Sequence, residues 1–152
     1  MPTPPALDPR TVPERTGSTY PEPFRSSVGW GAKRALGSEL GLTHFGVNLV
    51  RLGPGEWSSL RHWHTHEDEF VYVLEGELTL VTDAGEQRLG AGLAAGFPAG
   101  TPDGHQLINR SGAPALYLEA GDRSVEDLVT YSDVDLVFSR DFVYRHKSGE
   151  PY

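Results

Sequence analysis

Short apolar segments separated by turn residues constrain the fold of this chain more than any other feature. Apolar and polar side chains alternate from Phe45 to Leu49, as in a β-strand with one buried face. Similar segments, rich in aromatic and β-branched residues, follow at 59–64, 69–74, 77–82, 86–89, 93–97, 105–109 and 115–120. Eighteen glycines and twelve prolines supply turns between them. The pattern predicts an all-β sandwich or barrel in a single domain.

Several local structures are predicted from turn and capping residues. Segments 105–109 and 115–120 are expected to form a hairpin around Ser111-Gly112. Ser124 is expected to cap a helical turn over Ser124–Leu128. If strand parity holds, five apolar side chains form an interior wall suited to a small organic ligand: Phe45, Val47, Val71, Phe97 and Leu107.

Composition excludes several classes of partner and site. The net charge of −8 argues against nucleic acid or an anionic membrane as the main partner. The chain has no cysteine, which excludes disulfides and thiolate chemistry and fits a cytoplasmic protein. The N-terminus lacks the features of a signal peptide, and no apolar run approaches the length of a membrane span.

The chain divides into three parts by composition. Residues 1–27 hold seven of the twelve prolines and are expected to form an extended arm. This arm is either a disordered tail or packs along its own barrel or a partner subunit, with Tyr20 and Phe24 as anchors. The barrel domain is expected at 28–145, followed by a polar tail at 146–152.

A group of histidines and one glutamate carries the main functional signal. His62 and His64 stand at i and i+2, so both point to one face of a strand. Glu69 follows a polar turn, and His105 follows the Pro98–Gly100 turn. Three imidazoles and a carboxylate form a suitable set of ligands for one divalent transition metal. An octahedral metal held this way would keep two positions free for water, oxygen or substrate.

Neighbouring polar residues are interpreted differently. Glu67 and Asp68 compete with Glu69 for the ligand role, but we expect both in solvent at the turn. His66 is either a third in-facing imidazole or an exposed turn residue, and we favour the turn. Asn109 shares a strand face with His105 and is expected to orient structure rather than to react. If His66 or Asn109 closed the metal site, the ion would serve a structural purpose only.

With these residues, the chain resembles the cupin superfamily, in particular small single-domain bacterial cupins. The first cupin motif is matched by His62, His64, Glu69 and Gly76, with Gly55 one residue further upstream than usual. The second motif is matched by the following residues, with a longer spacer before the histidine: Gly92, Pro98, Gly100, His105 and Asn109. Together the motifs cover about residues 42–120.

The resemblance implies a double-stranded β-helix, or jelly-roll barrel, that is usually dimeric and holds a metal. It implies His62, His64, Glu69 and His105 as ligands of Fe, Mn, Ni or Zn. A redox-active metal would favour a dioxygenase, whereas a Lewis acid would favour an isomerase or lyase acting on a small organic substrate. Because cupins carry many activities on one barrel, a non-catalytic ligand-binding or metal-stabilised module remains the alternative.

Overall fold

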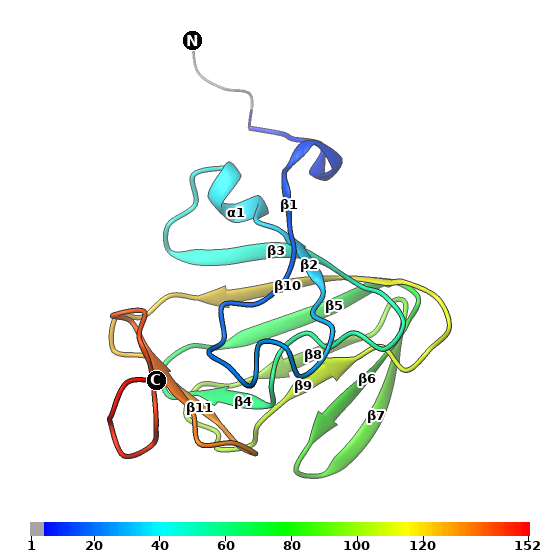
Figure 1. The fold of residues 1–152 in the computed structure, drawn as a ribbon. Coiled ribbons are helices and arrows are strands. Elements are labelled where there is room, and N and C mark those ends of the chain that lie inside the picture. The colour runs from blue at the N-terminus through cyan, green and yellow to red at the C-terminus, as the bar shows by residue number, and fades with distance from the viewer. Residues whose placement is uncertain (1–4) are drawn as a thin grey trace.

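Antiparallel strands form almost all the regular structure in the computed structural model, which describes residues 5–152 (Figure 1). Two short helical segments accompany them, the 3-10 turn η1 (Pro9–Thr11) and the helix α1 (Leu36–Glu39). The strands are β1 (Glu14–Arg15), β2 (Ala32–Arg34), β3 (Phe45–Leu52), β4 (His62–His64), β5 (Glu69–Glu75), β6 (Glu77–Thr82), β7 (Gly85–Gly90), β8 (Ala94–Phe97), β9 (Gln106–Ile108), β10 (Ala115–Asp122), β11 (Leu128–Tyr131), β12 (Val137–Ser139) and β13 (Tyr144–Arg145).

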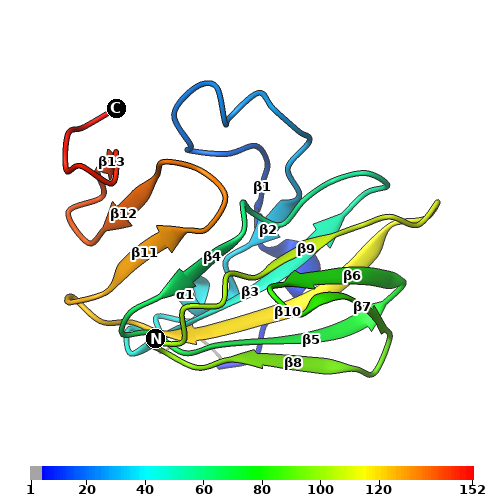
Figure 2. The same cartoon turned by 90° about the horizontal axis from the view of Figure 1, so that it is seen from below.

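The strands form three sheets that enclose the interior. The largest has the order β1-β2-β3-β10-β5-β8, and the others have the orders β7-β6-β9 and β13-β12-β11-β4. Figure 2 shows β6 and β9 lying across from the large sheet, with β4 and β11 closing one end. The arrangement is the predicted double-stranded β-helix, so the fold class is confirmed.

One hydrophobic core fills the space between the large sheet and the three-stranded sheet. Tyr117 of β10 pairs with Val50 of β3 on one side and Val73 of β5 on the other, and all three are fully buried. This register turns the even-numbered residues of β3 inward. Phe45 therefore lies on the outer face, 43% exposed, and the prediction that it lines the interior is wrong. Val71 and Leu107 are buried as predicted.

A second core lies where the N-terminal arm meets the four-stranded sheet. Tyr20 is buried there, and its ring makes edge contacts with Trp30, Tyr131 and Tyr144. The Tyr20 hydroxyl accepts a hydrogen bond from the Leu60 N–H at 3.2 Å. In Figure 1 the dark blue arm runs past the large sheet and then folds across the barrel end near β4. The described part of the arm thus packs on its own barrel, with Tyr20 as an anchor.

Two local predictions are corrected by the pairing of the strands. Strand β9 pairs with β6, whereas β10 pairs with β3 and β5, so the predicted hairpin of 105–109 with 115–120 does not form. Residues 124–127 form a hydrogen-bonded turn rather than a helical turn, although the Ser124 hydroxyl does accept from the Glu126 N–H at 3.3 Å.

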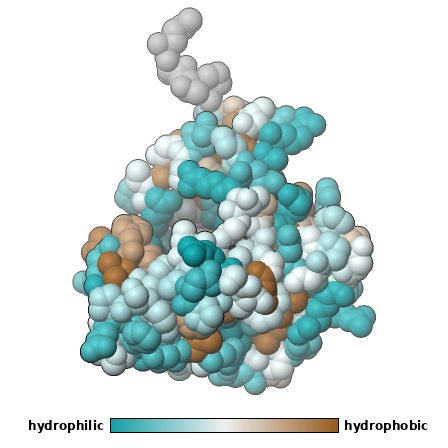
Figure 3. Space-filling view, in the orientation of Figure 1, coloured by the Kyte–Doolittle hydropathy of each residue, from teal (hydrophilic) through white to brown (hydrophobic). Residues whose placement is uncertain are grey.

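The surface of the molecule is mixed in character. On the face shown in Figure 3, hydrophilic residues predominate and hydrophobic residues form separate spots. Across residues 5–152, no helix combines the length and the apolar character that a membrane crossing requires.

Candidate functional site

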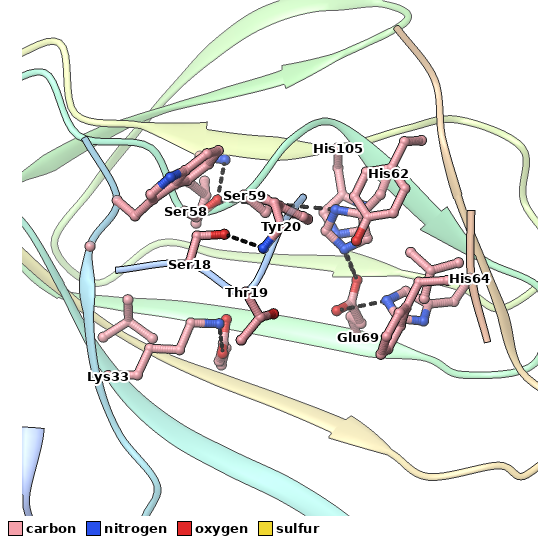
Figure 4. A pocket seen from close by; sticks show the side chains of 18 of the residues that line it. Ser18, Thr19, Tyr20, Lys33, Ser58, Ser59, His62, His64, Glu69 and His105 are labelled. Carbon is pink, nitrogen blue, oxygen red and sulfur yellow. Dashed lines mark hydrogen bonds and ion pairs between the residues drawn. The ribbon is translucent and has the colours of Figure 1, made fainter. Parts of the chain in front are cut away.

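Three strand regions bring the predicted site residues together. His62 and His64 both lie on β4, and Glu69 begins β5 after the polar turn. His105 precedes β9 and forms an antiparallel bridge with His62, in which the two backbones exchange hydrogen bonds of 3.1 and 2.9 Å. Figure 4 shows the three imidazoles gathered around Glu69 at one side of a cavity. We call these four residues the inner cluster.

The imidazoles of the inner cluster present their Nε2 atoms to one carboxylate. The distance from Glu69 Oε2 to His105 Nε2 is 2.6 Å, and to His62 Nε2 it is 3.6 Å. Glu69 Oε1 lies 3.2 Å from His64 Nε2. Ligand atoms of His62, Glu69 and His105 thus lie within 4.8 Å of one another, and His64 approaches the same carboxylate through its other oxygen.

The opposite ring nitrogens of two histidines are held by the protein. His62 Nδ1 donates to the Leu60 carbonyl at 2.8 Å, and His64 Nδ1 donates to Asp127 Oδ2 at 2.7 Å. A hydrogen bond at Nδ1 fixes the tautomer and leaves the Nε2 lone pair of a neutral imidazole available to a metal.

His105 is supported by stacking instead. Its ring lies flat against Phe97, with centroids 3.6 Å apart and an interplanar angle of 3°. Its buried Nδ1 has no hydrogen-bond partner within residues 5–152, and neither does the buried Oε2 of Glu69, whose close contact with His105 lacks hydrogen-bonding geometry. Unpaired buried polar atoms are rare and destabilising, so Glu69 Oε2, which faces the Nε2 atoms, indicates a group that binds at this point. His105 Nδ1 lies on the opposite side of its ring from that point.

A second set of charged residues lies behind His64. Glu67, Asp127 and Arg140 form what we call the outer cluster. Arg140 is ion-paired with Glu67 and lies 3.8 Å from Asp127 Oδ2. Glu67 also accepts from the Ser124 N–H at 2.9 Å, and Asp127 accepts from the His66 N–H at 2.9 Å. The outer cluster is thus satisfied by the protein itself.

The outer cluster corrects one prediction and adds a residue that the sequence did not reveal. Glu67 is 5% exposed, so the expectation that it sits in solvent is wrong, because Arg140 and the turn at Ser124 enclose it. Asp68 is exposed as expected. Asp127 is 2% exposed and was not predicted. In the sequence, Asp127 is marked only as an acidic residue directly before an apolar strand, and many turns without a functional role share this pattern.

Burial and neighbouring charges shift the pKa values of three site residues. Burial acts to lower the pKa of His64, but Glu69 and Asp127 outweigh it and raise that pKa from 6.5 to about 9. Burial would raise the pKa of Glu69, yet the three imidazoles hold it well below its usual range. Burial lowers the pKa of His105. In the absence of a cation, His64 therefore carries the proton that balances Glu69.

His66 and Asn109 lie outside the inner cluster. The His66 side chain is 49% exposed; its Nδ1 lies 2.7 Å from the Thr65 hydroxyl, and its Nε2 lies 3.7 Å from the exposed Glu126. Asn109 is fully buried and bonds to backbone carbonyls of Leu52 and Ala113, each at 2.8 Å. Asn109 thus ties loops together, as predicted, and His66 is the exposed turn residue that we favoured.

A cavity of about 530 Å³ opens beside the inner cluster. Its walls combine apolar and aromatic side chains, such as Val50 and Phe97, with polar groups such as Ser58 and Lys33. Burial raises the pKa of Tyr20 to about 12 and that of Tyr117 and Tyr131 well above the usual value, so these three phenols stay protonated. The volume and mixed lining suit a small polar organic molecule.

The inner cluster fits a divalent metal by the chemistry of its donors. Two imidazoles have their Nδ1 atoms anchored, the carboxylate is ionised, and Glu69 Oε2 lacks a hydrogen bond. Neutral nitrogens and an ionised carboxylate are what a metal of this class requires. A second group, His64 with Glu67 and Asp127, also places three ligand atoms within 4.8 Å of one another.

Comparison with known proteins identifies the family. The model of the cupin domain matches residues 48–121. A crystal structure from Silicibacter pomeroyi DSS-3, described as a sugar phosphate isomerase from a cupin superfamily, is 44% identical, with a TM-score of 0.92 and coverage of 97% of this chain and 96% of that one. The chain belongs to the cupin superfamily.

Other similar proteins match less of the chain. A candidate sugar phosphate isomerase from Acidithiobacillus ferrooxidans is 30% identical, with a TM-score of 0.68, over 76% of this chain and 70% of that one. The tetracenomycin polyketide synthase protein TcmJ of Streptomyces glaucescens is 33% identical over 87 residues, 56% of each chain. The chain therefore spans just over half the length of this curated relative.

Proposed function

We propose that this cupin is a metal-dependent isomerase that acts on a small phosphorylated sugar. The observation that carries the proposal is the convergence of three imidazole Nε2 atoms on Glu69 at the wall of an open cavity. The likeness to the Silicibacter pomeroyi protein supports the substrate class, because it extends over nearly the whole of both chains.

His62, His64, Glu69 and His105 would hold the metal. A divalent ion at this point would act as a Lewis acid that polarises a carbonyl or hydroxyl oxygen of the substrate. His66 and Asn109 are engaged elsewhere, so the described residues leave the cavity side of the cluster open to substrate.

Other groups on the cavity wall would handle protons and hydroxyls. Glu119 Oε1 accepts from Lys33 Nζ at 2.8 Å and from Asn48 Nδ2 at 2.9 Å, which leaves Oε2 available to take a proton from a substrate carbon. The buried hydroxyl of Tyr117 has no hydrogen-bond partner among residues 5–152, so it is available to a substrate hydroxyl.

Two measurements on untagged protein test this function. Elemental mass spectrometry of protein purified without added metal should find about one zinc, manganese, nickel or iron per chain. Incubation with aldose and ketose phosphates in D₂O should give isomerisation, with deuterium incorporated at the carbon beside the carbonyl. NMR spectroscopy detects both the isomerisation and the incorporated deuterium. The variant Glu119→Gln keeps the Oε1 acceptor for Lys33, and should retain metal but lose isomerisation. Glu77→Gln, an exposed carboxylate on β6, is the matched control.

Other results would favour the alternatives. Oxygen uptake with an iron-loaded protein, and no deuterium incorporation, would indicate a dioxygenase. Failure to take up any metal would indicate a binding module without catalysis.

The outer face of the large sheet is the surface that we propose for a homodimer. Alternate residues of β5 point outward there and leave large apolar groups exposed: Phe70 by 47%, Tyr72 by 38% and Leu74 by 38%. Exposed apolar surface of this kind favours association with a second copy. Light scattering should show a dimer that Phe70→Glu converts to a monomer, and a monomeric wild-type protein would contradict the proposal.

A further inference from the structure

The wall of the cavity beside the N-terminal arm differs in charge from the rest of the molecule. Residues 15–20 of the arm line the cavity together with Lys33 and the inner cluster. In Figure 4, Ser18, Thr19 and Lys33 lie to one side, and the imidazoles with Glu69 lie to the other. A ligand that spans the cavity would meet the arm at one end and the inner cluster at the other.

Arg15 carries the one positive charge at this wall that no described carboxylate neutralises. Three other arginines near the arm are ion-paired, Arg10 with Asp8, Arg25 with Glu22 and Arg34 with Glu14. Among the cavity's other cations, Lys33 is paired with Glu119 and Arg140 with Glu67. Arg15 is exposed, lines the cavity and makes no ion pair within residues 5–152.

Uncharged donors surround Arg15 on the arm. Thr16, Ser18 and Thr19 line the same cavity and contribute hydroxyl groups. The backbone N–H groups of Gly17, Ser18 and Thr19 donate to no protein oxygen in the described part of the chain. Gly17 has a φ of +84°, a left-handed conformation that favours glycine and shapes this turn. Lys33 lines the same cavity, but it donates to Glu119, whose carboxylate raises the pKa of Lys33.

We propose that the arm segment Arg15–Thr19 is the binding site for the phosphoryl group of the substrate. The inference rests on the proposed function and assigns the two ends of the substrate: the phosphoryl group at the arm and the reacting carbonyl end at the inner cluster. Arg15 supplies the charge, and the hydroxyl and backbone N–H groups supply hydrogen bonds, which together match the oxygens of a phosphomonoester.

The overall charge of the chain gives an unpaired cation in the cavity a particular importance. At a net charge of −8, the protein as a whole repels an anionic ligand. A cation with no partner inside the cavity reverses this repulsion at one point. The arm therefore has a direct role in substrate choice and is more than a cover for the barrel.

Binding of a substrate mimic that cannot isomerise tests the proposal without any activity. Calorimetry should show that glucitol 6-phosphate binds the wild-type protein more tightly than glucitol does. Arg15→Gln should weaken glucitol 6-phosphate by about 10- to 100-fold, the range for a charge-assisted hydrogen bond, and leave glucitol unchanged. The Arg15 side chain makes no ion pair or hydrogen bond in the described chain, and the substitution leaves the backbone pairing of β1 with β2 intact, so the variant should fold. Arg10→Gln is the matched control, because Arg10 lies on the same arm but not in the cavity.

Three outcomes would overturn the proposal. The first is equal affinity of the wild-type protein for glucitol 6-phosphate and for glucitol. The second is an equal loss of glucitol 6-phosphate affinity in Arg15→Gln and Arg10→Gln. The third is binding of gluconate as tight as that of glucitol 6-phosphate, which would assign the site to carboxylates. The variant His62→Ala with His105→Ala separates this proposal from the proposed function. If the double variant loses metal and keeps the preference for phosphate, the two ends of the cavity act independently. If wild-type protein shows the preference but binds no metal, the arm site stands and the isomerase proposal fails.

Discussion

The inner and outer clusters share His64 but differ in how their polar atoms are satisfied. In the outer cluster, every carboxylate is paired with Arg140 or with backbone N–H groups. In the inner cluster, Glu69 Oε2 faces the Nε2 atoms and is buried without a hydrogen bond among the described residues. Polar groups that only support a site have their hydrogen bonds satisfied within the protein, whereas polar groups that bind a ligand are left without a protein partner. We therefore infer that the inner cluster is the binding site and that the outer cluster supports it.

The largest expected effect follows from removing two inner imidazoles. The variant His62→Ala with His105→Ala should fall from about one metal ion per chain to almost none, because two of four donors are lost. Elemental mass spectrometry measures this directly. His66→Ala is the matched control, since His66 is exposed and outside the cluster. A double variant that keeps one ion per chain would move the site elsewhere.

The next effect concerns the stability of the metal-free protein at alkaline pH. The pKa of His64 is raised from 6.5 to about 9 in the folded protein, so its contribution to stability is complete below pH 6.5 and is lost as the pH rises through 9. The free energy of unfolding should fall by up to about 3 kcal/mol across this window. Urea unfolding at pH 6.5 and 9.5 measures it. His64→Gln should flatten the dependence, and an equally steep dependence in that variant would contradict the role of His64.

A smaller effect should follow from a change in the outer cluster. Asp127→Asn keeps an acceptor for His64 Nδ1 but removes the charge, and should weaken metal affinity by about 10- to 100-fold. Competition with a chromophoric chelator measures the affinity. Glu126→Gln, an exposed neighbour, should leave it unchanged. If Asp127→Asn abolished metal binding as fully as the double histidine variant does, Asp127 would be a ligand rather than a support.

The smallest effect concerns the stacking partner of His105. Phe97→Leu keeps an apolar contact but removes the ring that fixes the orientation of His105. Stacking contributes about 0.5 to 1.5 kcal/mol, so metal affinity should fall by roughly 2- to 12-fold. The same chelator titration resolves this. A loss greater than that in Asp127→Asn would show that stacking positions the cluster more strongly than the hydrogen bond to the carboxylate does.

Three residues of the inner cluster could be predicted from their local spacing, whereas His105 stands far downstream and was predicted from the Pro98–Gly100 turn and the second cupin motif. His62 and His64 share a strand face, and the turn before Glu69 is short, so the pattern itself places them together. Asp127 comes from a turn some sixty residues later, and only the pairing of β11 with β4 brings it to His64. The false hairpin of 105–109 with 115–120 has the same cause, since pairing between distant strands leaves no local signature.

The burial of individual side chains could not be predicted from the sequence either. Glu67 and Asp68 stand side by side in a polar turn, yet only Glu67 is enclosed, by an arginine more than seventy residues away. Phe45 is exposed because the register of β3 with β10 sets the parity of the whole strand. Composition likewise left the path of the Pro-rich arm open, and the contacts of Tyr20 decide it.

The central claim is that the inner cluster binds the metal and the outer cluster supports it. A crystal structure of the metal-loaded protein, with the ion located by its anomalous scattering, tests this most directly. We expect the ion about 2.0 to 2.2 Å from the Nε2 atoms of His62, His64 and His105 and from Glu69, with Asp127 bonded only to His64 Nδ1. An ion held instead by His64 Nδ1, Glu67 and Asp127 would contradict the account, because the two clusters would then have exchanged roles.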